Sequence, residues 1–203
     1  MTLATLETRV KTRIRADMST PAVNDLADES IATWANEKKS EVIHLLKDPV
    51  RFFPTLQVIG TALTFATGVE DLPADYELYT NVVVNNGTVT NRKCRITEDV
   101  KKFRALDSNN FINTPHLDTP VILISSAIYV LPTSITAGVL DYIKVHPTIS
   151  DSQATLFTEL GDLVLLNKIV QEYYRTIPQR FDLADNIEKE IDRILNVNNI
   201  RKP

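Results

Sequence analysis

The chain has 203 residues, of which 43% are hydrophobic and 24% charged, so it can bury a core of its own and lacks the composition of a disordered protein. Its formal net charge of −4 argues against a protein that coats nucleic acid, because phosphate binding needs a surplus of lysine and arginine. A single cysteine excludes an internal disulfide and any metal site built from several thiolates, which is typical of a reducing compartment.

The N-terminal segment has no apolar run behind a basic start, and no apolar stretch approaches the roughly 20 residues of a membrane span. We therefore expect no signal peptide, no membrane contact and synthesis in the cytoplasm.

Two amphipathic helices are predicted in the first 50 residues. In the first, apolar residues recur every three or four positions, at Leu3, Leu6, Val10 and Ile14. The second is predicted to begin at an acidic cap, Asp25 or Asp28, and to stop at Asp48-Pro49. Trp34 lies in its apolar pattern and is predicted to anchor the core.

The middle of the chain shows short β-rich runs instead. Asn85-Asn86-Gly87 between two such runs predicts a tight hairpin, because both turn residues must accept positive φ. Antiparallel pairing is expected throughout, since no gap between strands holds a full crossover helix. The predicted elements are an ambiguous strand over 56–66, a hairpin of 78–84 and 88–96, a short helix over 98–106, a second hairpin of 121–124 and 127–131, and a neighbouring strand over 139–145.

Helices return after Pro147. A helix capped by Ser150 or Asp151 is predicted to end near Arg175, and its continuous hydrophobes at 163–166 indicate cover on more than one side. A last amphipathic helix is expected over 183–197. The fold class is therefore α+β: a helical bundle made by 1–50 and 148–203, with an antiparallel β-rich domain with a short helix inserted at 51–147.

No constellation of catalytic or metal-binding residues is evident. His44, His116 and His146 have no metal-ligand spacing, and we expect each to be a structural or surface residue. Cys94 has no local histidine pattern, and the five glycines form no phosphate-binding loop. We expect a protein that is not an enzyme and has no cofactor and no metal.

A basic cluster is the one candidate anion surface, and it consists of Arg92, Lys93, Arg95, Lys101, Lys102 and Arg104. The simpler interpretation of this cluster is a solvated hairpin face or a subunit contact, and the alternative is contact with passing DNA.

Several phrases of the sequence carry a family resemblance. They are LADESIATWANEKKSEV in the second helix, with Asp28, Ile31, Trp34 and Asn36; DLPADYELYTNVVVNNG, with Leu72-Pro73-Ala74-Asp75; and AIYVLPTSITAGVLDYIKVHPTI, with Tyr129, Pro132, Leu140, Tyr142 and Pro147. In this order, and followed by two helices, they resemble the head-to-tail adaptor proteins of tailed bacteriophages, also called connector or neck-ring proteins, particularly those of short-tailed phages.

The resemblance implies a structural virion protein in the neck or tail region. It implies a ring, commonly dodecameric, that binds below the portal protein, contacts downstream tail or tail-hub proteins, and lets viral DNA pass with transient, non-specific contact. Family members often dock on the portal through C-terminal elements. The residues that this assigns to a portal or subunit interface are Ile194, Leu195, Ile200, Arg201 and Lys202.

Three alternatives stay open. A tail-completion or tail-terminator protein would cap a tail tube, but should devote more of its length to long strands. A nucleic-acid-binding module would work through the basic cluster. An undetected enzyme is the third, and the sequence offers it no set of residues.

Overall fold

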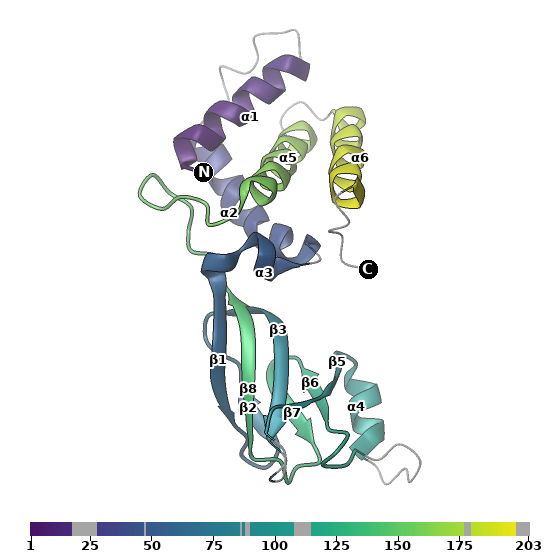
Figure 1. Cartoon of the computed structure of the whole chain (residues 1–203). Helices are drawn as coiled ribbons and strands as arrows, with labels where there is room; N and C mark the ends of the chain where they lie inside the picture. The colour runs from purple at the N-terminus through teal and green to yellow at the C-terminus, as the bar shows by residue number, and fades with distance from the viewer. Residues whose placement is uncertain are drawn as a thin grey trace. The chain divides into compact units, whose positions relative to one another are not determined.

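The computed structural model describes residues 1–17, 28–46, 48–85, 87, 90–107, 115–176 and 180–197. The fold is α+β, with helices from both ends of the chain and two β-sheets from its middle (Figure 1). The chain divides into two compact units. The helical unit is Met1–Leu56 with Val145–Pro203, and the β unit is Gln57–Lys144.

The helical unit is built around one central helix. Its elements are α1 (Leu3–Asp17), α2 (Asp28–Leu45), α3 (Pro49–Phe52), a 3₁₀ turn (Pro54–Leu56), α5 (Glu159–Thr176) and α6 (Phe181–Val197). Helix α5 contacts α1, α2 and α6 (Figure 1). Because it is covered on several sides, it is apolar around most of its circumference, as predicted, and Val164, Leu165 and Leu166 are buried. Leu163, which is 40% exposed, points away from this cover.

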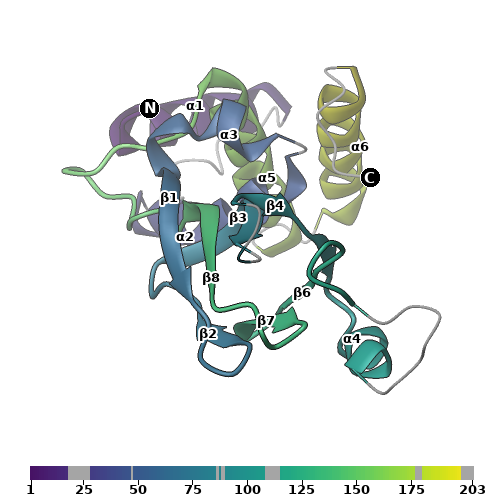
Figure 2. The ribbon, with the colours of Figure 1, turned by 60° about the horizontal axis from the view of Figure 1, so that its bottom comes forward.

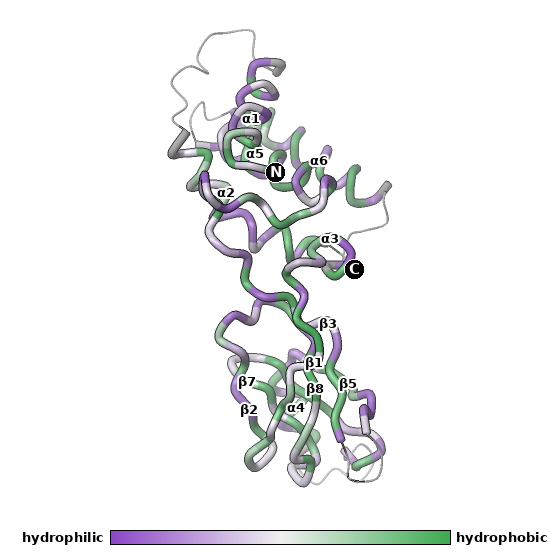
Figure 3. The backbone as a smooth tube through the Cα atoms, turned by 60° about the vertical axis from the view of Figure 1, so that its left-hand side comes forward, coloured by the Kyte–Doolittle hydropathy of each residue, from purple (hydrophilic) through white to green (hydrophobic). Residues whose placement is uncertain are grey.

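The predicted helical stripes are confirmed as the core of this unit. Leu3, Leu6, Val10 and Ile14 of α1 are all buried, as are the inward residues of α6. Trp34 is buried and packs edge-on against Tyr173 of α5, with 6.5 Å between the ring centroids. Figure 3 shows the corresponding alternation of apolar and polar residues along α6.

Helix α5 begins at Glu159, so the predicted start at Ser150 or Asp151 is wrong. Upstream backbone groups bond to side chains instead of to a helical turn. Asn36 of α2 accepts the N–H of Ile149 at 2.8 Å, and His146 Nε2 accepts the N–H of Leu156 at 2.9 Å. The segment before Glu159 is therefore not helical, and it contains a turn closed by backbone bonds between Ser150 and Gln153.

The β unit contains two four-stranded sheets and one helix. Its elements are β1 (Gln57–Thr64), β2 (Val69–Asp71), β3 (Tyr76–Asn85), β4 (Arg92–Lys93), β5 (Arg95–Thr97), α4 (Val100–Asp107), β6 (Val121–Ile124), β7 (Ala127–Leu131) and β8 (Ala137–Lys144). The strand orders are β1-β8-β3-β4 and β2-β7-β6-β5. Figure 2 shows α4 beside β6.

Strands β6 and β7 are buried on both faces, which explains their nearly unbroken apolar sequence. Ile122, Ile124, Ile128 and Val130 face the other sheet and join its core. The alternate residues, Val121, Leu123, Tyr129 and Leu131, pack with Phe103 of α4 in a second, smaller core. The predicted hairpin of 121–124 and 127–131 is confirmed residue for residue.

Two pairing predictions for the β region are wrong, and a third is correct only in part. Strand β5 pairs with β6 in parallel, because α4, although it has only eight residues, supplies the crossover between them. The strand predicted at 139–145 is β8, which lies between β1 and β3 in the other sheet. The predicted hairpin of 78–84 and 88–96 is correct in its antiparallel pairing, of Val83 with Lys93 and Val84 with Arg92, but these pairs are too far apart in the sequence for a two-residue turn to join them.

Candidate functional site

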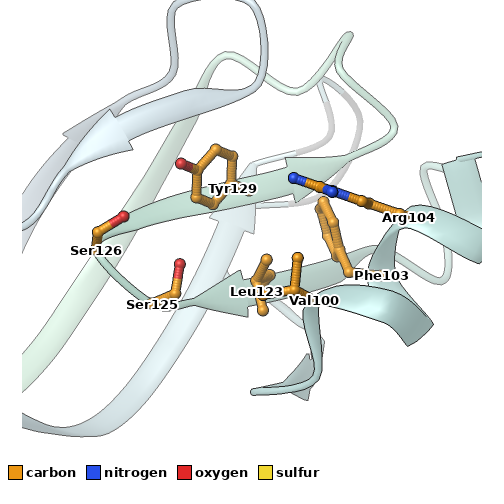
Figure 4. A pocket seen from close by; sticks show the side chains of 7 residues that line it. All are labelled: Val100, Phe103, Arg104, Leu123, Ser125, Ser126 and Tyr129. Carbon is orange, nitrogen blue, oxygen red and sulfur yellow. The ribbon is translucent and has the colours of Figure 1, made fainter.

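An open pocket lies between α4 and the β6–β7 hairpin, within the β unit. It has a volume of about 390 Å³ and is lined by Val100, Phe103, Arg104, Leu123, Ser125, Ser126 and Tyr129 (Figure 4). It is the open side of the small core under α4. The helical spacing of positions 100, 103 and 104 places them on one face of α4, and the hairpin supplies the opposite wall.

The pocket combines an apolar floor with a polar rim. Phe103 and Leu123 are 8% and 3% exposed, and the Phe103 and Tyr129 rings lie 6.3 Å apart between centroids. Arg104 extends from α4 over Phe103 toward Tyr129, while the two serine hydroxyls lie at the other end (Figure 4). The described lining includes no histidine, cysteine or carboxylate beside these serines. Such a lining suits the binding of an apolar group that carries a negative charge nearby.

The basic cluster is only partly one surface. Arg92 is paired with Asp118, at 2.7 Å between Nη2 and Oδ1, and is half-buried. Lys93, Arg95, Lys101, Lys102 and Arg104 are exposed. Lys102 lies 3.8 Å from Asp99, and Arg104 belongs to the pocket lining. The helix therefore sends its basic residues to different faces.

The predicted portal-interface residues differ in their placement. Leu195 is fully buried in the helical unit, so its assignment to an interface is wrong for this chain; it belongs to the apolar stripe that holds α6. Ile194 is half-buried. Ile200, Arg201 and Lys202 lie outside the described residues.

His44 and His116 are exposed, whereas His146 is buried and structural. Its Nδ1 lies 2.6 Å from the Pro147 carbonyl oxygen, and its Nε2 accepts the Leu156 N–H, which together define the neutral ring. Burial lowers the pKa of His146. Burial also raises the pKa of Cys94 to about 11, which keeps its thiol protonated.

Among the described residues, no group of three or more His, Cys, Asp or Glu side chains is arranged to hold a metal ion. In the same part of the chain, none of the helices is both long enough and apolar enough to cross a membrane.

Residues of the sequence segments that carry the family resemblance form hydrogen bonds with other residues of the same unit. In the β unit, the Tyr142 hydroxyl donates to Asp75 Oδ1 at 2.7 Å, which joins the LPAD phrase to LDYIKVHP. This bond and burial raise the pKa of Tyr142 to about 12, with burial the larger cause. In the helical unit, Asn36 bonds both backbone groups of Ile149. These hydrogen bonds therefore hold together segments of each unit that are far apart in the sequence.

The pocket could not be predicted from the sequence. The spacing of Val100, Phe103 and Leu106 indicates an apolar face on the short helix, but only the strand pairing shows what that face meets. The wall at Ser125, Ser126 and Tyr129 carries no local signal.

A comparison with models of known protein families finds no match, and neither does a comparison with curated proteins. The function must therefore be inferred from the residues of the chain itself.

Proposed function

We propose that this chain is a ring-forming head-to-tail adaptor of a tailed bacteriophage, a structural virion protein that binds below the portal and lets DNA pass. The observation that carries the proposal is the chain order. Both ends contribute to one helical unit, and a continuous β unit, Gln57–Lys144, is inserted between them. This is the organisation that the adaptor resemblance implies.

The hydrogen bonds between the quoted phrases add support. Asp75 with Tyr142, and Asn36 with Ile149, join segments that are far apart in the sequence. A set of short motifs that bond to each other identifies a fold better than the same motifs taken singly, because each then has a structural reason for its place.

Exposed apolar residues support self-association. Ile59 on edge strand β1 is 71% exposed, and Phe181 at the start of α6 is 61% exposed. An edge strand and exposed anchors are features that neighbouring subunits cover. A ring needs such surfaces on two different sides of each copy.

The tail-terminator alternative is the weaker one. Helices α1, α2, α5 and α6 span 15, 18, 18 and 17 residues, whereas the longest strand, β3, has 10. A subunit that continues a tail tube should have a larger share of its residues in long strands.

The decisive experiment mixes the purified full chain with the cognate portal and measures mass by sedimentation velocity, with electron microscopy of the product. We expect a closed ring that joins one end of the portal. A protein that stays monomeric with and without portal would contradict the proposal.

C-terminal docking needs a finer test than deletion of the last helix. Ile187, Ile191 and Leu195 are buried, so removing α6 would open the core and abolish binding indirectly. Deletion of 198–203 alone leaves α6 intact and removes Ile200, Arg201 and Lys202. Weakened portal binding with an unchanged unfolding midpoint would support docking through this tail, and full binding would leave the adaptor proposal standing without it.

Contact with DNA is proposed only as weak and transient. Lys101 and Lys102 are exposed on α4, and their replacement by glutamine should remove any salt-dependent affinity for duplex DNA. Tight binding that survives this change would favour a nucleic-acid-binding module through another surface.

A further inference from the structure

The pocket under α4 has no assigned occupant. An exposed side chain elsewhere in the chain has the shape and character to fill it. Phe181, at the first position of α6, is 61% exposed, although phenylalanine is normally among the most buried residues. The pocket, by contrast, is a concave apolar site with exposed Val100 at its edge. We call the exposed Phe181 side chain the knob and the pocket under α4 the hollow.

The pocket is large enough to admit an aromatic side chain. Its volume of about 390 Å³ lies at the low end of the roughly 300–1,000 Å³ of small-molecule sites. Its floor carries Phe103 and Tyr129, whose rings can meet a third ring edge to face. An inserted phenyl group would therefore be covered by aromatic and aliphatic carbon.

The charges beside the knob and the hollow are opposite. Asp185 follows Phe181 by four positions, so the two lie on the same face of α6, one turn apart, and Asp185 is exposed. The nearer carboxylate, Asp182, is already bonded twice by Arg180, at 2.9 and 2.8 Å. Across the interface, Arg104 extends over the pocket (Figure 4). A phenyl group in the pocket would bring Asp185 toward Arg104.

We propose that the pocket under α4 binds Phe181 of a second copy of this chain, with Arg104 paired to Asp185 of that copy. The knob and the hollow lie on different surfaces of different units, so the contact is heterologous and repeats head to tail. A head-to-tail contact closes into a ring when its rotation allows. The inference rests on the proposed function, for which it names the subunit contact.

Charge reversal gives the sharpest test. Arg104→Glu and Asp185→Arg should each raise the dissociation constant of subunit association by about tenfold or more, and the double variant should restore it, because every copy then carries the reversed pair. Phe181→Ser should weaken association at least as much. The matched control is Leu163→Ser, which removes another exposed apolar side chain of the helical unit, outside both surfaces. Sedimentation velocity of the full chain gives the readout.

Cross-linking identifies the partner. In a Cys94→Ser background, one preparation carries Ser126→Cys and the other Asp182→Cys, and a short bismaleimide is added to the mixture. We expect dimers linked between the two kinds of chain, formed only on mixing. In a chain that carries both cysteines, closure within single molecules without linked oligomers would overturn the proposal.

The outcomes separate the two hypotheses. Rings that form normally in Phe181→Ser and in both charge variants would overturn the pocket contact and leave the adaptor function intact. Equal loss with Leu163→Ser would also overturn it. Cross-linked open chains with no ring would support the contact and contradict the ring. If neither rings nor cross-linked species form, both hypotheses are contradicted.

Discussion

His146 is held in its neutral form by the bonds on both sides of its ring. Burial lowers its pKa, and Lys39 lowers it further, although the bond to the Pro147 carbonyl acts in the opposite direction. Protonation would place a proton on Nε2, which accepts the Leu156 N–H. The ring therefore links pH to the stability of the segment that leads into α5.

We predict that the free energy of unfolding falls as the pH drops below about 6.5, the ordinary pKa of histidine. The unfolded state binds the proton more readily than the folded state, so stability is complete above this value and declines below it, by at most about 1.4 kcal/mol per pH unit. Urea unfolding between pH 7 and pH 5 gives the measurement. Glu172, whose pKa is lowered from 4.5 mainly by its bond to Lys38, contributes only at lower pH.

His146→Gln is the control, because an amide can accept the Leu156 N–H but does not titrate. The variant should cost about 1–3 kcal/mol at pH 7 and flatten the slope between pH 7 and pH 5. A variant with the slope of the wild type would assign the pH dependence to other groups.

Lys168 places a nearly buried ammonium in the helical unit. It is 9% exposed, and its Nζ lies 2.7 Å from Glu41 Oε1 across the contact of α5 with α2. Removal of the carboxylate alone leaves the cation without this partner in a site that water reaches poorly. Replacement of the cation by an apolar side chain of similar shape leaves no such penalty.

We predict that Glu41→Ala destabilises the chain by about 1–3 kcal/mol, whereas Lys168→Met costs less than about 1 kcal/mol. The double variant should be more stable than Glu41→Ala alone. Chemical denaturation of the three variants completes a double-mutant cycle. A double variant whose cost equals the sum of the two single costs would show that the pair contributes nothing beyond its separate side chains.

At the scale of elements, local signals and long-range pairing were not equally predictable. The stripes of α1 and α6 and the hairpin of β6 and β7 follow from sequence periodicity, because each element carries its own pattern. Strand β5 has three residues and no pattern, and only its place beside β6 decides its direction. The pocket depends on that same pairing, so neither Tyr129 nor Ser126 could be placed in it from the sequence.

Strand β8 lies between β1 and β3 in its sheet, and Gly138 is paired with Leu63 of β1 and with Val84 of β3. A Cβ at Gly138 would lie 2.7 Å from the Val83 carbonyl oxygen and 3.2 Å from Phe65 Cε2. Neither neighbour is the free end of a flexible chain. A methyl group there must push β3 away from β8.

We predict that Gly138→Ala destabilises the β unit by about 2–3 kcal/mol. The same methyl group at Gly60 meets no atom within 4 Å, so Gly60→Ala costs only the strain of φ +79°, about 1 kcal/mol. Urea unfolding of both variants gives the comparison. Equal midpoints for Gly138→Ala and the wild type would mean that the strands move apart without cost.

At the scale of the whole molecule, the insertion of the β unit follows a simple geometric rule. Its first and last strands, β1 and β8, are antiparallel neighbours, and Gln57 pairs with Ile143. The chain therefore enters and leaves the unit at adjacent points, about 5 Å apart between paired Cα atoms. Each unit also has buried clusters of its own. An insertion of this kind preserves both folds, because neither has to span a gap.

We predict that residues 57–144 fold as an isolated fragment, and that the rest of the chain folds when a four-residue Gly-Ser linker joins 56 to 145. Such a linker reaches about 13 Å, more than the gap requires. Cooperative urea unfolding and dispersed amide NMR signals from each product would confirm this. A fragment that shows no cooperative transition would mean that the β unit needs the helical unit to fold. If both fold, mixing the two products with the portal would reveal which unit binds it, since each could then be tested in the absence of the other.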